Sequence, residues 1–158
     1  MAKVKAEVEV EAKVEVEVEV EVKAEAKIKT PLVFEGRTPC QELSVQLGLN
    51  KGEACDKMKW YFLFYTDSVT GKPSYFLMAG IGYRKESMKK GRWEIVTEPN
   101  GDIIYRLYSD IWTRPLILLQ GDDNILFFMD ADGRLLVGNE NFSYTLNRKE
   151  KEYPPIDR

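Results

Sequence analysis

The sequence predicts an all-β protein, an antiparallel meander barrel of about eight strands with one short helix and extra N-terminal strands. Three observations support this prediction. Residues 2–29 alternate strictly between apolar and charged side chains. From residue 58 onward, apolar segments recur every 8 to 14 residues between turn-forming residues. A convincing helix start and stop are found only in residues 38–48.

The first segment, residues 1–30, is a single repeated pattern. From Ala2 to Lys29 every even position is Ala, Val or Ile, and every odd position is Lys or Glu. Period-two alternation places all apolar groups on one face of a strand. One straight strand of this length would span about 90 Å, far more than ordinary strands do. We therefore expect bends, with strands near residues 3–10, 14–22 and 27–36.

The alternation has two interpretations. So strict a pattern is typical of designed sequences, in which apolar residues face the core and charged residues face water. In the first interpretation the segment is sheet filler, and its charges serve only solubility. In the second it is an interaction edge, because its six Lys and eight Glu make it self-complementary. Residues 2–29 would then pair with the same segment of another copy.

The next segment predicts a strand followed by a short helix. Pro31 cannot donate a hydrogen bond within a sheet, so it interrupts or borders the strand here. Thr38 fits an N-cap, Pro39 the first helical position and Gln41 the third, as in a capping box. Gly48 is a natural helix stop. We therefore expect a two-turn helix immediately after the first barrel strand.

The two cysteines allow three interpretations. Cys40 would lie in the first turn of the helix, where the helix dipole lowers a thiol pKa, and it would then be a reactive or metal-binding thiol. Alternatively, Cys40 and Cys55 form a structural disulfide, which closes a loop of about 15 residues and contributes roughly 3 kcal/mol. Two buried free thiols are the third alternative. The disulfide is our preferred interpretation.

The rest of the chain predicts a meander of strands separated by turns. The Asn100-Gly101 turn is the strongest hairpin indication in the chain. Glycines at positions 80 and 82 indicate a bulge or bend. The predicted strands are residues 58–65, 74–85, 92–97, 103–108, 116–120, 125–130, 134–137 and 142–147.

Composition excludes several classes of function. The chain of 158 residues has a net charge of −3, whereas nucleic-acid binding requires a basic face. It contains no histidine, so Ser-His-Asp, Cys-His and His-zinc chemistry are excluded. No nucleophile–base pair or carboxylate dyad has a meaningful spacing, and we expect no enzymatic activity. No apolar run approaches the roughly 20 residues of a membrane-spanning helix.

Evidence for a metal site is weak. Cys40 and Cys55 are the candidate ligands, and a methionine thioether would complete a soft site for Cu(I). The four methionines concerned are Met58, Met78, Met88 and Met129. Filling of the core explains these methionines equally well. We expect no other cofactor.

Four stretches together resemble one protein family. They are Phe34–Cys40, Gly91-Arg92-Trp93, Ile125–Asp130 with Gly133, and Phe142–Leu146. Their order and spacing over roughly residues 32–148 resemble those of the NlpE-like bacterial envelope lipoproteins of the copper-resistance type. The resemblance divides the chain into the segment 1–30, an NlpE-like domain at 31–148 and a tail at 149–158.

The resemblance implies a small lipocalin-like barrel of the periplasm or outer membrane. It also implies a role in surface sensing, envelope stress or copper tolerance, and no catalysis. Two features depart from the family. Its Cys-x-x-Cys pattern is missing, because Gln41, Glu42 and Leu43 follow Cys40. The chain as written carries no signal or lipidation sequence, so we expect it in the cytoplasm when it is expressed alone.

Two functional hypotheses follow. The first is a non-catalytic, envelope-type barrel that binds a small ligand or an envelope protein. The second is an engineered structural module that self-assembles through residues 2–29.

Overall fold

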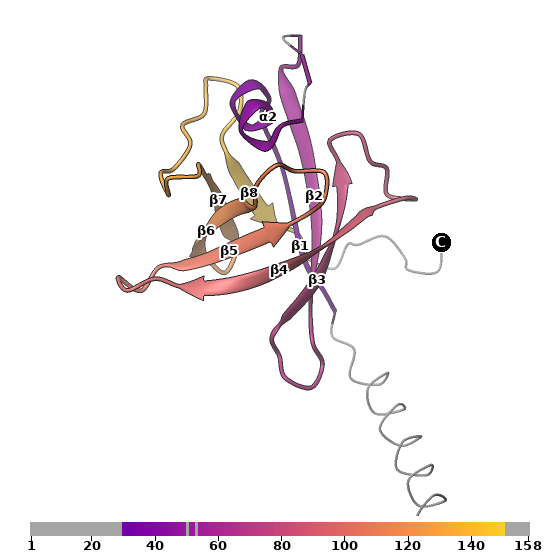
Figure 1. Ribbon diagram of the computed structural model, residues 1–158, viewed down its shortest axis with the longest axis vertical. Helices are drawn as coiled ribbons and strands as arrows, with labels where there is room; N and C mark the ends of the chain where they lie inside the picture. Colours follow the sequence, from indigo (N-terminus) through magenta and orange to yellow (C-terminus); the bar gives the residue numbers. More distant parts are fainter. Residues whose placement is uncertain (1–29, 50, 53, 151–158) are drawn as a thin grey trace, which may run out of the picture.

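The computed structural model describes residues 30–49, 51–52 and 54–150, which form a closed eight-stranded antiparallel barrel (Figure 1). One short helix follows the first strand, so the predicted fold class is confirmed. Residues 30–36 of the strand predicted at 27–36 are described, and residues 32–36 form the start of the first barrel strand (Leu32–Pro39). The predicted N-terminal strands at 3–10 and 14–22 lie outside the described residues. So does nearly all of the predicted tail at 149–158.

Each strand pairs with its neighbour in the sequence, and β8 pairs with β1 to close the barrel. The elements in chain order are β1 (Leu32–Pro39), α2 (Gln41–Leu47), β2 (Lys57–Thr66), β3 (Pro73–Gly80), β4 (Lys89–Thr97), β5 (Ile103–Tyr108), β6 (Leu116–Asp122), β7 (Ile125–Met129) and β8 (Thr145–Arg148).

Aromatic rings fill the interior of the barrel. On β2, Trp60 stacks on Phe62 at a centroid distance of 5.7 Å, and Phe62 stacks on Phe64 at 5.4 Å. The ring of Phe128 on β7 lies next to that of Trp60, with the two ring centroids 5.2 Å apart. An eight-stranded barrel is just wide enough for its own side chains. Here those side chains are large, and the core is solid at these positions.

Helix α2 covers one end of the barrel (Figure 1). Its Leu43 and Leu47 are fully buried in the main core. Gly48 ends the helix in the left-handed conformation, with φ 71°, as predicted. The loop after β5 packs against this end, where the Thr113 backbone N–H donates to the Leu47 carbonyl at 3.0 Å. This hydrogen bond joins the end of the helix to the loop between β5 and β6.

The predicted capping box is wrong. Thr38 and Pro39 belong to β1, and the helix begins at Gln41 with Cys40 at the N-cap, where no side chain caps the helix. Thr38 is fully buried, and its hydroxyl accepts a hydrogen bond from the Trp60 indole N–H at 2.9 Å. A tertiary contact with the core therefore takes the place of the expected local cap.

Three predicted strands also differ from the structure. The strand expected at 74–85 stops at Gly80, because Gly80, Ile81 and Gly82 all have positive φ and turn the chain back. The strand expected at 134–137 is absent from the barrel, and only an isolated bridge joins Leu135 to Met129. The last strand, predicted at 142–147, is the shorter β8.

We predict that Thr38→Val destabilises the protein by about 2 kcal/mol, because it leaves the buried Trp60 N–H without an acceptor. Chemical denaturation followed by tryptophan fluorescence measures this loss. Thr97→Val, an exposed strand position, is the matched control and should change stability little. Equal effects of the two substitutions would contradict the importance of the Thr38–Trp60 bond.

Candidate functional site

The structure joins Cys40 and Cys55 in a disulfide at the end of the barrel covered by α2, with a Cα–Cα distance of 5.7 Å. Neither cysteine is a free thiol. The Gln41 side chain strengthens the same connection, because its amide donates to the carbonyls of Gly52 at 2.6 Å and Cys55 at 2.8 Å. The start of the helix and the loop before β2 are thereby held together.

The candidate Cu(I) ligands are not gathered at one place. Met58 lies in the same core cluster as Cys40, but Met88 packs on a separate cluster outside the barrel. A thiolate is the form of cysteine that binds metal, so the disulfide would first have to be reduced. Within the described residues, no group of three or more His, Cys, Asp and Glu side chains is placed to hold a metal ion.

The Asp130–Gly133 turn is held by its own backbone. The Asp130 carboxylate accepts hydrogen bonds from the backbone N–H groups of Asp132 and Arg134, each at 2.9 Å. These residues therefore form a turn that is stabilised by the side chain of its first residue.

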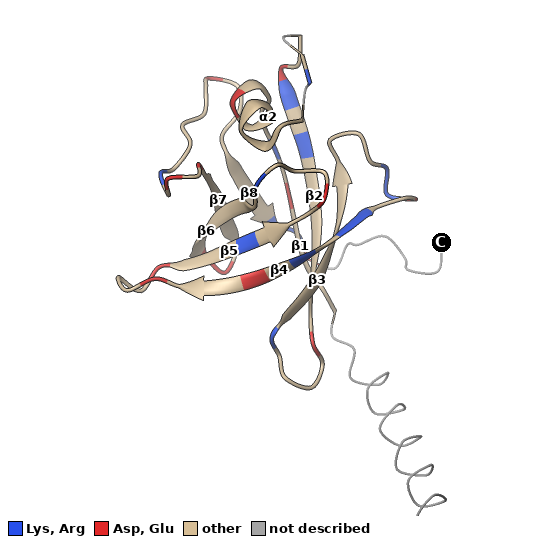
Figure 2. Ribbon diagram, in the orientation of Figure 1, with Lys and Arg blue, Asp and Glu red and all other residues tan. Residues whose placement is uncertain are grey.

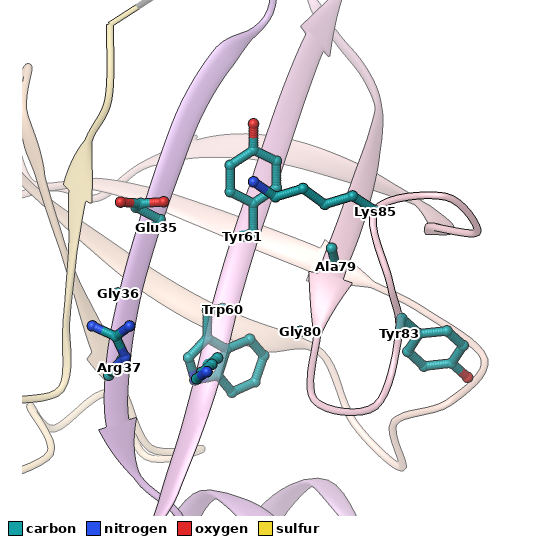
Figure 3. Close-up of a pocket in the computed structure, with 10 residues that line it drawn as sticks. Glu35, Gly36, Arg37, Trp60, Tyr61, Ala79, Gly80, Tyr83 and Lys85 are labelled. Carbon is teal, nitrogen blue, oxygen red and sulfur yellow. The ribbon is translucent and has the colours of Figure 1, made fainter. Parts of the chain in front are cut away.

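A pocket of about 330 Å³ lies on the outer wall of the barrel, over β1, β2 and the end of β3 (Figure 3). Its floor is the row Gly36–Trp60–Gly80, in which Trp60 packs into the barrel core. The outer face of this row carries no side chain, and outward-facing side chains lie on both sides of it. The lining residues are Glu35, Gly36, Arg37, Lys59, Trp60, Tyr61, Ala79, Gly80, Tyr83 and Lys85.

Gly80 shapes the pocket. A Cβ at this position would collide with the carbonyl oxygen of Lys59, and its φ of 89° is also unfavourable for other residues. The turn is tied to β2 by the Ile81 backbone N–H, which donates to the same Lys59 carbonyl at 3.1 Å. The chain therefore doubles back over the outer wall and brings Tyr83 and Lys85 to the pocket (Figure 3).

The pocket is positively charged. Arg37 and Lys59 are opposite each other in the β1–β2 ladder, and both are exposed. Lys85 places its ammonium group 4.3 Å from the centroid of the Tyr61 ring, a cation–π contact (Figure 3). Within the described part of the chain, none of these three cations forms an ion pair, whereas Glu35, the only acidic residue lining the pocket, lies 3.6 Å from Lys149.

The three basic residues of β4, which is partly blue in Figure 2, each contact another side chain. Lys89 lies 2.6 Å from the Asp110 carboxylate, and this hydrogen bond raises the pKa of Lys89. Lys90 lies over the Tyr75 ring at 4.5 Å, and Arg92 over the Tyr108 ring at 3.9 Å. Lys85 has a ring contact of the same kind, so the difference lies at Arg37 and Lys59, which have neither an ion pair nor a ring contact among the described residues.

Sequence analysis missed these cations. Arg37, Lys59 and Lys85 are separated by more than 20 residues in each step and form no motif. Only the register of β1 with β2 places Arg37 beside Lys59. The available indication was the alternation in β1 and β2, which assigns Arg37 and Lys59 to the outer face. The register between the two strands was not predicted.

Comparison of the chain with protein families, curated proteins and solved structures finds no match. Among the residues that the structure describes, no helix is long and apolar enough to cross a membrane.

We predict that replacing both Cys40 and Cys55 with Ala lowers the free energy of unfolding by about 3 kcal/mol, because the loop of 15 residues is then open in the unfolded chain. Denaturant unfolding of the oxidised and reduced protein measures the effect. Reduction should reproduce the loss in the wild type and do nothing to the double variant. An unchanged wild type after complete reduction would contradict this prediction.

Proposed function

We propose that this protein is a non-catalytic binding protein of the NlpE-like type, which binds a small ligand carrying an anionic group and an apolar or aromatic part. The outer-wall pocket over β1, β2 and β3 is the proposed binding site. The observation that carries the proposal is that three cations, Arg37, Lys59 and Lys85, line one pocket together with Tyr61.

The chemistry of the pocket suits such a ligand. Ligand sites combine apolar walls with a few polar groups that fix orientation. Here Tyr61 and Ala79 supply the apolar wall, and Arg37 and Lys59 supply adjacent positive charges. An arginine binds a carboxylate or phosphate through paired hydrogen bonds, whereas a lysine acts as a point charge. An anion between them would relieve the repulsion of two neighbouring cations.

The filled interior of the barrel favours a site on the outside. The rings of Trp60, Phe62, Phe64 and Phe128 occupy the interior positions at which a lipocalin-like barrel would hold a ligand. A ligand in this place would have to displace fully buried aromatic side chains, at several kcal/mol each. The outer pocket requires no such rearrangement.

Two groups, Asp67 and Tyr144, have pKa values shifted away from the neutral range. A general base operates best with a pKa near neutrality. Hydrogen bonds from the backbone of Thr70 and Val69 lower the pKa of Asp67, and burial raises the pKa of Tyr144 to about 12. These shifts move the groups away from neutrality and suit structural roles.

The NlpE-like assignment, with a place in the periplasm or outer membrane, rests on the sequence resemblance and is supported by two features. The small antiparallel barrel is what the resemblance implies. The Cys40–Cys55 disulfide is suited to an oxidising compartment such as the periplasm.

We predict that the protein binds 2-naphthoate, an aromatic carboxylate, more tightly than 2-naphthylmethanol, its neutral analogue. Fluorescence titration measures both affinities. The double substitution Arg37→Gln and Lys59→Gln should weaken binding of the carboxylate by roughly tenfold, since each charged hydrogen bond contributes about 1.5 kcal/mol or more. The affinity for the alcohol should stay nearly constant.

Lys72→Gln is the matched control, because Lys72 is an exposed lysine outside the pocket. It should leave both affinities unchanged. Equal affinities for the acid and the alcohol, or equal effects of the control and the pocket substitutions, would contradict the proposed site.

A second candidate function is self-assembly through residues 2–29. The observation that favours it is the unbroken alternation of apolar and charged side chains. We predict that sedimentation velocity of the full chain shows a mass that rises with concentration, and that salt weakens this association by screening Lys–Glu pairs. A monomer at every concentration would contradict the assembly function.

A further inference from the structure

Five apolar side chains on the outer wall of the barrel are buried like core residues. Their exposed fractions are 1 % for Leu63, 2 % for Val33, 3 % for Ala79 and 6 % each for Tyr61 and Tyr65. They form a cluster separate from the main core, which we call the outer cluster. Outer-wall residues of a barrel normally face water. Exposed fractions as low as these mean that other residues cover the five side chains.

The outer cluster extends across three strands. In the ladder, Leu63 is paired with Val33 on β1 and with Leu77 on β3. Tyr65 stacks on Tyr75 with ring centroids 4.5 Å apart and an interplanar angle of 15°. The wall thus presents a continuous apolar and aromatic strip, which begins where the positively charged pocket ends, at Tyr61.

The described side chains that pack against the outer cluster lie on its β3–β4 side. Tyr75 and Leu77 are partly buried and belong to the same sheet, in which side chains on one face stand beside one another. Met88 precedes β4 at the side of the cluster. Lys85, which also precedes β4, lies over the Tyr61 ring. The described hydrophobic residues that pack against the cluster thus come from β3 and the segment before β4, and none of them comes from the β1 side.

The C-terminal end of the described chain lies beside the outer cluster. The Lys149 backbone N–H donates to the Val33 carbonyl at 2.8 Å, and the Lys149 ammonium lies 3.6 Å from Glu35 on the same strand. Beyond Glu150 the sequence continues for eight residues, Lys151–Arg158. Eight extended residues reach roughly 26 Å, and crossing from β1 to β3 requires only about 10 Å.

The sequence of this segment suits an aromatic surface. Tyr153, Pro154, Pro155 and Ile156 are consecutive apolar residues between charged ones. Proline-rich segments bind to aromatic-lined grooves because their conformation is already restricted, and proline has no N–H that burial would leave unpaired.

We propose that residues 151–158 dock across the outer face of β1, β2 and β3, with Tyr153–Ile156 covering the outer cluster. The segment serves as an intramolecular strap that shields an apolar strip which would otherwise invite association. This inference goes beyond the proposed ligand site, which shares Tyr61 and Ala79 with the outer cluster, whereas Arg37, Lys59 and Lys85 lie outside the cluster.

The first test uses paired variants of the full chain. Tyr153→Ser with Ile156→Ser removes the apolar contacts of the segment, whereas Lys151→Ser with Asp157→Ser is the matched control in the same segment. We expect the apolar pair to increase the fluorescence of anilinonaphthalene sulfonate severalfold and to lower the midpoint of thermal unfolding by roughly 5 °C. The control pair should resemble the wild type in both measurements.

The second test identifies the occupant directly. p-Benzoyl-phenylalanine in place of Tyr153 should photo-crosslink to peptides containing Val33, Leu63 or Leu77, at the mass of a single chain. Crosslinks between two chains would identify a second copy as the occupant, and crosslinks elsewhere or none would place the segment off the barrel wall. Either result would overturn the proposal, as would equal dye binding by the two paired variants.

Discussion

The β1–β2 ladder is the contact on which the rest of the structure depends. Eight consecutive residue pairs join the two strands, from Leu32–Phe64 to Pro39–Lys57. Along most of its length β2 is buried on both faces, with Phe62 in the main core and Leu63 in the outer cluster. The disulfide and the Thr38–Trp60 hydrogen bond hold the end of this ladder at which α2 covers the barrel.

The sequence was sufficient to predict the class of fold, because alternation and turn residues act locally. Pro31 before β1, Gly48 after α2 and the Asn100-Gly101 hairpin all lie where local rules place them. The wrong predictions share a different cause. Thr38 has the side chain of an N-cap, but its hydroxyl is used by Trp60, 22 residues away. Tertiary burial outweighs the local preference there.

The candidate site could not be predicted in the same way, because strand register creates it. A shift of one residue in the register of β1 and β2 would move the side chains of one strand to the opposite face of the sheet. Arg37 and Lys59 would then no longer be side by side. Nothing local to either residue specifies the pairing. It is specified by long-range packing of Phe34 against Phe64, whose rings lie 6.0 Å apart in the core. The proximity of the two cations is thus a consequence of the strand register that hydrophobic packing sets.

The glycines explain why binding is proposed outside the barrel. Small residues on an inner wall can leave room for a ligand, but Gly91 does not do so here. A Cβ at Gly91 would collide with the Phe76 ring and with the backbone carbonyl of Tyr108, so the ring already occupies that space. At Gly36 and Gly80 it is neighbouring backbone that leaves no space for a Cβ. These glycines permit close packing inside the barrel, and the pocket that is lined by Tyr61 together with Arg37, Lys59 and Lys85 is on the outer wall.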